Sequence, residues 1–256
     1  MESDNGAVRE GVLVPVLPGS KNFDNSIRPP LQNSYMYKES KQSFRYNSAF
    51  LINNATLQER YEAFRTKRRD MGYTEEEMEE SYGFLLFDDE NKANRVGETG
   101  VVPGHSTCTT LGDPSKGVYV SKYSDCLDLN RWYHGKSGYI AIIRLTKGRV
   151  REVTENYTVN YTSPSNGFDC HVSEQLSSVS ANTSSFLAFE RTQYYMYELP
   201  VGGAVQPPSH VCPFAVVAFS YWDTKTPASE DKEKRYTSLF PLVGFVTNDI
   251  MLTRKY

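Results

Sequence analysis

The chain has 256 residues, with 28 lysine and arginine residues against 31 aspartate and glutamate residues, and its formal net charge is −3. This length fits one large domain or two small ones, and the near balance of charge argues against a globally basic nucleic-acid-binding protein, although it is compatible with a local basic patch. Hydrophobic residues make up 39% of the chain, so it can bury a core, and no stretch approaches the roughly 20 apolar residues that span a bilayer.

The N-terminus and the cysteines indicate an intracellular protein. Residues 1–5 are acidic and polar, without the cationic start and apolar run of a signal peptide. The four cysteines lie far apart and form no CxxC pair, which favours reduced thiols over disulfides. They are Cys108, Cys126, Cys170 and Cys212.

The first part of the chain predicts an extended arm and then a strand. Residues 1–31 are interpreted as an arm on the domain surface, because two prolines interrupt the apolar run over residues 12–19. Residues 44–52 have the composition of a strand and end at a pair of asparagines. Asparagine is a good helix N-cap, so we expect a helix to follow directly.

Residues 55–71 predict an amphipathic helix. Leu57, Tyr61 and Phe64 recur at the spacing of one helix face, and Gly72 ends the pattern. Four cations crowd its C-terminal end: Arg65, Lys67, Arg68 and Arg69. They form either an interaction patch for a partner or nucleic acid, or a solvated helix end that complements the helix dipole, and the second interpretation is favoured.

The middle of the chain alternates strands with short helices. Thr74 and Glu77 form a capping box that predicts a short acidic helix. Three further strands are predicted over residues 82–87, 117–120 and 138–145, the last being the clearest in the chain. Two more helices are predicted, one after residues 88–90 that ends near Gly97 or Gly100, and one over residues 122–129 with Ser121 as its cap.

The last hundred residues carry weaker patterns. Residues 154–184 are polar and poorly periodic, and they predict a mobile insertion. Strand signals occupy residues 149–153, 186–189, 193–198 and 212–222. Residues 224–256 are interpreted as a polar linker followed by an apolar tail. Many short strands with a few short helices predict an α+β domain with a mostly antiparallel sheet.

Few residues form a recognisable chemical motif. The glycine spacings match neither a P-loop nor a dinucleotide-binding loop, and HExxH and GxSxG are absent from the sequence. A two-cysteine, two-histidine metal set would need Cys170, His171, His210 and Cys212 to meet. Because adjacent ligands are unlike the usual zinc spacing, ordinary packing is favoured for these four residues.

Two further segments allow a functional and a structural interpretation. Asp88, Asp89 and Glu90 at a strand end are either a cation or acid–base site, or a solvated helix start, and the helix start is favoured. The tyrosine-rich residues 193–197 are either a stacking platform for bases or two faces of a sheet. Their alternation favours the sheet.

Three segments resemble the catalytic domains of poly(ADP-ribose) polymerases (PARPs). Residues 50–60 are similar to the point where a strand of those domains leads into a helix. Residues 117–121 and the strand over 138–145 are similar to their Gly-(Ile/Leu)-Tyr-Phe-(Ala/Ser) segment and the strand after it. Residues 193–198 are similar to the strand that bears the catalytic glutamate. The resemblance implies an ADP-ribosyltransferase fold, a split and mostly antiparallel sheet with flanking helices.

Longer strings resemble the TASOR family of silencing proteins, whose domain is a degenerate relative of that fold. The strings are Glu80–Leu85, Leu111–Tyr119, Cys170–Ser173, Thr192–Tyr195 and His210–Val217. They are specific in combination and are closer to the second paralogue of the family than to the first. The resemblance implies a pseudo-PARP domain over residues 32–223, at the N-terminus of a large nuclear protein. It also implies a scaffold role in HUSH-type silencing complexes, with M-phase phosphoprotein 8 and periphilin as partners.

The residues that match the active-site positions of active relatives are altered. In those relatives a histidine bonds a ribose of NAD and the glycine after it bonds the nicotinamide, whereas here the matching strand runs into Asp88 and Asp89. Tyr119 matches the tyrosine that stacks on nicotinamide. Gln193 matches the glutamate that stabilises positive charge on the ribose, and a neutral amide cannot supply that charge.

Three hypotheses follow from the sequence. The favoured one is a catalytically dead interaction scaffold in transcriptional silencing, which binds no NAD and contacts no membrane. The alternatives are an active, divergent mono-ADP-ribosyltransferase and a module that binds RNA or chromatin through Arg65–Arg69. The degenerate triad disfavours the first alternative, and the charge balance disfavours the second as a stand-alone role.

Overall fold

The structure of the chain is a computed structural model that describes residues 12–127, 137–199 and 206–222. The chain divides into two units after Trp222, and the second unit lies outside the described residues. The predicted linker and apolar tail over residues 224–256 therefore fall outside them too. Within the described part of the chain, no helix has the length and hydrophobicity needed to cross a bilayer.

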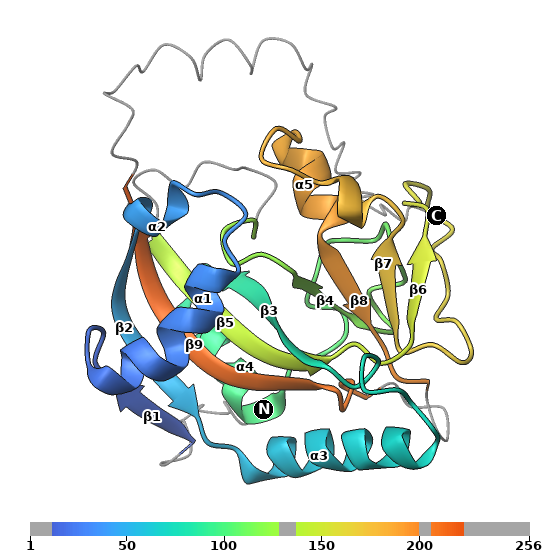
Figure 1. Cartoon of the computed structure of the whole chain (residues 1–256), viewed down its shortest axis with the longest axis horizontal. Helices are drawn as coiled ribbons and strands as arrows, with labels where there is room; N and C mark the ends of the chain where they lie inside the picture. The colour runs from blue at the N-terminus through green and yellow to red at the C-terminus, as the bar shows by residue number, and fades with distance from the viewer. Residues whose placement is uncertain (1–11, 128–136, 200–205, 223–256) are drawn as a thin grey trace, which may run out of the picture. The chain divides into compact units, whose positions relative to one another are not determined.

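Nine strands form one sheet in the order β1-β2-β9-β5-β3-β4-β8-β7-β6 (Figure 1). Every neighbouring pair is antiparallel except β6 and β7, which are parallel. In chain order the strands are β1 (Leu13–Val16), β2 (Phe44–Ile52), β3 (Glu80–Phe87), β4 (Val118–Ser121), β5 (Ser137–Thr146), β6 (Val150–Val153), β7 (Cys170–Ser173), β8 (Gln193–Met196) and β9 (Val211–Tyr221).

The sheet is split between β3 and β4. A single residue pair, Phe84 with Ser121, joins these two strands, whereas β3 and β5 pair over eight residues. The sheet therefore has a five-strand part (β1, β2, β9, β5, β3) and a four-strand part (β4, β8, β7, β6). The prediction of a split, mostly antiparallel sheet in an α+β domain is confirmed.

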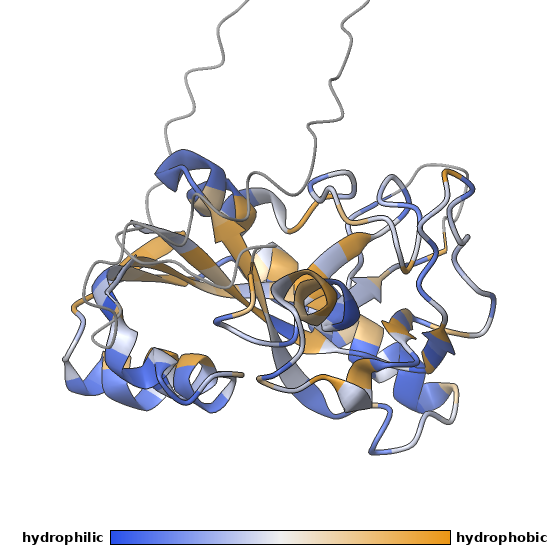
Figure 2. Ribbon diagram, turned by 90° about the horizontal axis from the view of Figure 1, so that it is seen from above, coloured by the Kyte–Doolittle hydropathy of each residue, from blue (hydrophilic) through white to orange (hydrophobic). Residues whose placement is uncertain are grey.

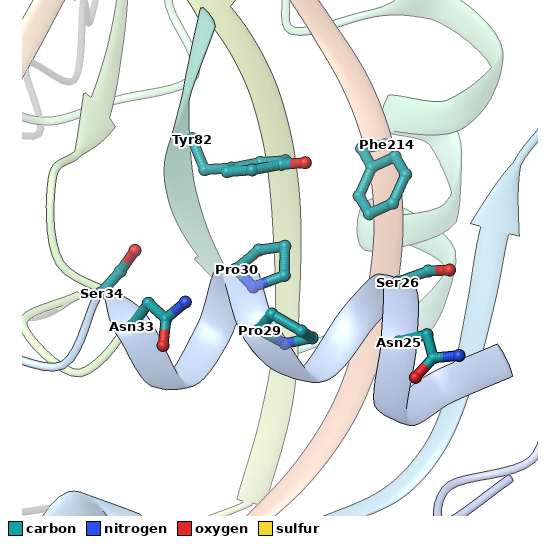
Figure 3. A pocket seen from close by; sticks show the side chains of 8 residues that line it. All are labelled: Asn25, Ser26, Pro29, Pro30, Asn33, Ser34, Tyr82 and Phe214. Carbon is teal, nitrogen blue, oxygen red and sulfur yellow. The ribbon is translucent and has the colours of Figure 1, made fainter. Parts of the chain in front are cut away.

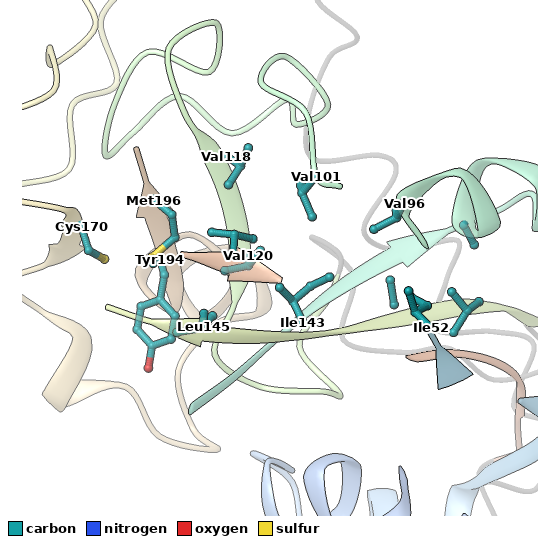
Figure 4. Packing of buried hydrophobic residues seen from close by; sticks show 14 of the residues in the cluster. Ile52, Val96, Val101, Val118, Val120, Ile143, Leu145, Cys170, Tyr194 and Met196 are labelled. Atoms are coloured by element: carbon teal, nitrogen blue, oxygen red, sulfur yellow. The ribbon is translucent and has the colours of Figure 1, made fainter. Parts of the chain in front are cut away.

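The two strongest predicted strands are central, as expected. β5 lies between β3 and β9, and β9 lies between β2 and β5. Both strands are largely buried, and hydrophobic residues concentrate along the middle of the sheet (Figure 2). One apolar cluster contains Ile143 and Leu145 of the five-strand part and Val120 and Met196 of the four-strand part (Figure 4). This cluster packs the two parts together where backbone pairing is sparse.

The helices flank the sheet (Figure 1). They are the π-helix η1 (Phe23–Ile27), α1 (Arg28–Asn33), α2 (Ser40–Ser43), α3 (Ala55–Asp70), α4 (Glu90–Thr99), the 3₁₀ turn η2 (Leu176–Ser178) and α5 (Ser185–Arg191). The prediction of α3 is confirmed. The side chain of Asn54 accepts a hydrogen bond of 3.2 Å from the backbone N–H of Leu57, and Gly72 ends the helix with φ of +79°.

The prediction of an extended arm over residues 1–31 is wrong beyond β1, and residues 1–11 lie outside the described part. Residues 23–33 are helical, and Phe23, Ile27 and Leu31 are fully buried against the sheet. These three residues recur every four positions, which is a helical spacing. Pro29 and Pro30 lie at the start of α1, directly after the π-helix η1, where they have no N–H to donate to the preceding turn.

Three other expectations also fail. Part of the predicted insertion over residues 154–184 is β7, which is buried within the sheet. Residues 186–189 belong to α5 rather than to a strand. The described part of the predicted helix over 122–129 consists of turns. β7 and residues 186–189 are each four residues long and residues 122–129 are eight, so each is too short for its periodicity to identify the element.

A buried carboxylate fixes the N-terminal helices to the rest of the domain. Asp125 accepts hydrogen bonds from the backbone N–H groups of Met36 (2.7 Å) and Tyr37 (2.9 Å) and from the hydroxyl of Ser40 (2.6 Å). Burial raises the pKa of this carboxyl to about 6, while the three donors act in the opposite direction. Asp125 is therefore ionised at neutral pH and holds a segment about 85 residues away along the chain.

We expect Asp125→Ala to lower the free energy of unfolding by about 2–4 kcal/mol, because three donors would lose their buried acceptor. Chemical denaturation monitored by circular dichroism measures this change. Asp88→Ala is the matched control, since Asp88 is exposed, and its denaturation midpoint should stay close to that of the parent. Equal midpoints for both variants would contradict the role of Asp125.

Candidate functional site

Two of the three predicted site residues lie on neighbouring strands of the four-strand part. In the pairing of β4 with β8, Tyr119 is opposite Tyr195 and Ser121 is opposite Gln193. Because side chains alternate along a strand and directly paired residues share a face, Tyr119 and Gln193 project from the same face of the sheet. Both side chains are buried.

The hydroxyl of Tyr119 binds the backbone of a loop that covers this face. It accepts hydrogen bonds from the N–H groups of Leu111 (3.1 Å) and Gly112 (2.7 Å), and it donates one to the carbonyl of Gly112 (2.6 Å). Only 1% of Tyr119 is exposed. The loop thus lies directly over the tyrosine.

Three further side chains fill the space beside Tyr119. With it they form what we call the tyrosine cluster: Tyr119, Tyr195, Tyr197 and His171. The rings of Tyr119 and Tyr195 are 5.0 Å apart between centroids, and His171 meets Tyr197 edge-on at 4.9 Å. The hydroxyl of Tyr195 donates to the carbonyl of Asp113 at 2.7 Å.

The tyrosine cluster also fixes a second loop, which precedes β7. The hydroxyl of Tyr197 accepts from the N–H of Ser165 at 3.1 Å. The two ring nitrogens of His171 contact the carbonyl of Leu111 (2.8 Å) and the hydroxyl of Ser165 (2.9 Å), so this imidazole bridges both loops. Every polar group of the cluster is therefore used for structure.

The electrostatics of the cluster are neutral. Burial raises the pKa of Tyr119 well above its usual value and raises that of Tyr197 to about 12. Burial also lowers the pKa of His171. At neutral pH the tyrosines are protonated and the imidazole is uncharged, so the cluster presents no charge to an ionic ligand.

Gln193 is oriented by its own neighbourhood. Its amide nitrogen donates a hydrogen bond of 3.0 Å to the carbonyl of Phe189, which lies in α5. Only 3% of the residue is exposed. The side chain that matches the catalytic glutamate of active PARPs thus makes a neutral contact that a carboxylate cannot make.

Asp88 follows β3, at the edge of the five-strand part of the sheet. Its side chain is 84% exposed and forms an ion pair of 3.1 Å with Lys92. Asp89 caps α4 by accepting from the N–H of Lys92 at 2.9 Å. The interpretation of residues 88–90 as a helix start is confirmed.

The two-cysteine, two-histidine metal set, the disfavoured alternative for these residues, is not assembled in the described part of the chain. Within the described part of the chain, which includes Cys170, His171, His210 and Cys212, no group of three or more histidine, cysteine or acidic side chains is placed to hold a metal ion. All four cysteines are buried free thiols. Two imidazoles also contact backbone carbonyls, that of His171 at Leu111 and that of His210 at Asp169.

The basic patch at the end of α3 is divided between the interior and the surface. Arg65 donates to the hydroxyl of Thr146 at 2.6 Å, and Arg68 forms a buried ion pair with Asp169 and lies over the ring of Phe64. Lys67 and Arg69 are exposed. The expectation that the four cations form one surface is therefore wrong, because two of them have partners in the fold.

Two cavities lie on another region of the domain. The larger, of about 430 Å³, lies between α1 and strands β3 and β9, where the rings of Tyr82 and Phe214 face Pro29 and Pro30 (Figure 3). The smaller, of about 310 Å³, lies beside the start of β2. Neither is lined by Tyr119, Gln193 or Asp88.

Comparison with known proteins places this geometry in a family. A family model described as "Protein of unknown function (DUF3715)" matches residues 67–213. A crystal structure of the TASOR pseudo-PARP domain superimposes with a TM-score of 0.74 at 33% sequence identity, covering 82% of this chain and 99% of that one. The chain belongs to the TASOR family. The predicted ADP-ribosyltransferase-like fold is confirmed by this match to a pseudo-PARP domain.

Curated TASOR proteins agree with this assignment. TASOR of Xenopus laevis is 38% identical over 214 residues, and TASOR of Mus musculus is 32% identical over 224 residues. These matches cover 80% and 84% of this chain. The aligned region is 14% of the length of each relative, so the TASOR-family domain corresponds to a small part of those proteins.

The residues of this TASOR-family domain do not fit NAD, the cofactor of active PARPs. The ring and hydroxyl of Tyr119, which would meet the nicotinamide, are covered by Leu111 and Gly112. The amide of Gln193 is hydrogen-bonded to the carbonyl of Phe189, and the exposed carboxylate of Asp88 is paired with Lys92. A dinucleotide would have to displace both loops from the tyrosine cluster.

The sequence predicts the positions of Tyr119 and Gln193 but not the side chains and loops that cover them. The strings around Leu111, Cys170 and Thr192 were associated with the family, yet the role of His171 and Ser165 was not recognised. The sequence signal that points to the cluster is the alternation Tyr195-Met196-Tyr197, which places two tyrosines on one face of a strand. Their hydrogen-bond partners are 32 and 82 residues away along the chain, so sequence spacing does not identify them.

We expect Arg68→Ala to lower the free energy of unfolding by about 3 kcal/mol, because it leaves the carboxylate of Asp169 buried without its ion-pair partner. Lys67→Ala, one position away and exposed, should change it by less than about 0.5 kcal/mol. Urea denaturation of both variants measures the difference. Similar losses would show that the two cations are equivalent.

We expect Gly112→Ala to lower the free energy of unfolding by about 1–3 kcal/mol through overpacking. A Cβ atom at this position would lie 2.2 Å from Cε1 of Tyr195, so the loop or the ring must move. Thr107→Ala, at an exposed position in the same loop, is the control and should be nearly neutral. Thermal unfolding that is unchanged in Gly112→Ala would contradict the tight contact.

Proposed function

We propose that this TASOR-family domain is a catalytically inactive PARP-like module that acts as an interaction scaffold in a nuclear, HUSH-type silencing complex. The observation that carries the inactive part is the loop over Tyr119, the residue that matches the nicotinamide-stacking tyrosine of active relatives, because the loop backbone makes three hydrogen bonds to its hydroxyl. The printed description of the solved relative, a pseudo-PARP domain, supports the same interpretation.

Displacing the cover would be costly. The tyrosine cluster makes at least five buried hydrogen bonds to the two loops, and each such bond contributes on the order of 1 kcal/mol. NAD would have to provide this free energy in addition to that of its own binding. The obstacle is mainly steric, since the charge of the exposed Asp88 is paired with that of Lys92.

The scaffold part of the proposal rests on the intact fold of the domain. A buried core spans both parts of the sheet, and the outer helices have exposed surfaces that are available for contacts with other proteins. M-phase phosphoprotein 8 and periphilin are the partners that we propose from the family resemblance, together with the nuclear location. The alternative of an active mono-transferase gains no support from the site, because the neutral Gln193 cannot stabilise a cationic ribose.

We expect calorimetric titration of the chain with up to millimolar NAD to give no binding signal, and an auto-modification assay to give no product. Gln193→Glu should remain inactive as well, because the new carboxylate would face the carbonyl of Phe189 and Tyr119 would stay covered. An active PARP domain is the positive control in both assays. Micromolar binding, or modification that is lost in Tyr119→Phe, would contradict the pseudoenzyme proposal.

Deletion of residues 12–222 from the full-length protein should abolish reporter silencing in cells. Co-precipitation of M-phase phosphoprotein 8 and periphilin from the same cells then separates two roles for the domain. Loss of either partner would assign the contact to this domain. Retention of both partners with loss of silencing would place its contacts elsewhere in the complex, and unchanged silencing would refute the scaffold role.

A further inference from the structure

A basic hollow lies beside the start of β2. Its volume is about 310 Å³, at the lower end of the roughly 300–1,000 Å³ typical of ligand sites. Three cations from three elements line it: Arg28 of α1, Lys41 of α2 and Arg45 of β2. No acidic residue is among its lining residues, and the nearby Asp24 pairs with Arg28 at 2.8 Å. Together these four charged groups give a local charge of +2.

The charge of this region contrasts with that of the whole chain. Residues 12–48 contain five lysine or arginine residues and two acids, a balance of +3, whereas the chain as a whole has −3. Within the described part of the chain, neither Lys41 nor Arg45 forms an ion pair with an acid, and both are exposed. The hollow is therefore a local positive site on an acidic protein, complementary to phosphate.

The cations are held in place by the fold. The guanidinium of Arg45 donates from Nη1 to the carbonyls of Gln42 and Phe44, which leaves further N–H donors of that group for a ligand. Arg28 lies over the ring of Phe23, 5.3 Å from its centroid. Such fixed positions reduce the entropy that a bound anion would cost these side chains.

Aromatic rings and an open strand edge adjoin the cations. Of the three rings beside the hollow, Phe23 and Phe44 are buried at 0% and 5% exposure, and the half-buried Tyr46 is the one that reaches the surface. The centroid of Tyr46 is 5.8 Å from that of Phe23 and 6.4 Å from that of Phe44, so the two buried rings support it from below. β1 pairs with β2 only over Ala49–Ile52, so within the described residues no strand covers the outer edge of residues 44–48. Cations for a backbone next to aromatic faces for bases are the combination that binds single strands.

We propose that the basic hollow is a binding site for single-stranded nucleic acid, with backbone phosphates on Arg28, Lys41 and Arg45 and a base against the ring of Tyr46. This ring favours a nucleic acid over a phosphopeptide, which needs the charge but not a flat aromatic surface. The site differs from the end of α3, where two of the four cations are used internally. It is also independent of the pseudoenzyme proposal, since it lies outside the tyrosine cluster.

The test is fluorescence anisotropy of a labelled 12-nucleotide uridine RNA with the whole 256-residue chain, at several salt concentrations between 50 and 200 mM. We expect Lys41→Glu combined with Arg45→Glu to weaken binding at least tenfold. Replacing both by glutamine should lower the salt dependence, because each lost phosphate contact on a single strand reduces the slope by about 0.7. Lys67→Glu with Arg69→Glu is the matched control, with the same charge change at exposed positions, and should weaken binding less than twofold.

Each outcome decides the proposal. Binding that falls in the hollow variant and persists in the control supports it, provided that both variants melt like the parent. Equal weakening by both pairs would show nonspecific attraction and overturn the site. Failure of the parent chain to bind RNA at 50 mM salt would overturn it too. A phosphoserine peptide that binds the parent chain when the RNA does not would assign the hollow to phosphorylated protein instead.

Discussion

The contact between the ring of Tyr195 and the backbone of Gly112 is the constraint on which the four-strand part of the domain depends. A glycine is needed there because any Cβ atom would overlap the ring. The close approach lets the hydroxyls of Tyr119 and Tyr195 bond to the loop on either side of Gly112. The same loop then gives the carbonyl of Leu111 to His171, which in turn holds Ser165. One missing side chain thus permits two loops to be fixed over a face of the sheet.

The face of the sheet that carries Tyr119 and Gln193 is a packed core. The hydroxyl of Tyr119 bonds to the backbone of the covering loop, and its ring packs against that of Tyr195. Gln193 is a neutral side chain that donates a hydrogen bond to a helix carbonyl. A buried carboxylate at position 193 without a cationic partner would be unfavourable. The neutral glutamine is therefore compatible with the packed interior, although it cannot stabilise a cationic ribose.

Much of the fold could be predicted from the sequence, and the failures have identifiable causes. β5 and β9 agree with the prediction because each is a long, nearly continuous apolar run, β2 because of its strand-type composition, and α3 because it carries one apolar stripe at helical spacing. The helices after Gly19 differ from the predicted extended arm because the burial of Phe23, Ile27 and Leu31, four residues apart, outweighs the disruptive effect of the prolines. The inward direction of Arg68 was missed because its partner lies 101 residues away, a tertiary contact that no local pattern records.

Because a single residue pair joins β3 and β4, the ion pair of Arg68 and Asp169 is one of the contacts that hold the two parts of the sheet together. Arg68 belongs to α3, which packs on β9 through Leu57 and Tyr61, whereas Asp169 directly precedes β7 on the other side of the split. The carbonyl of Asp169 also contacts His210, just before β9. The ion pair therefore links the two parts of the sheet at their margin. In native-state amide exchange, β6 and β7 should open as a separate unit at lower free energy than β5 and β9.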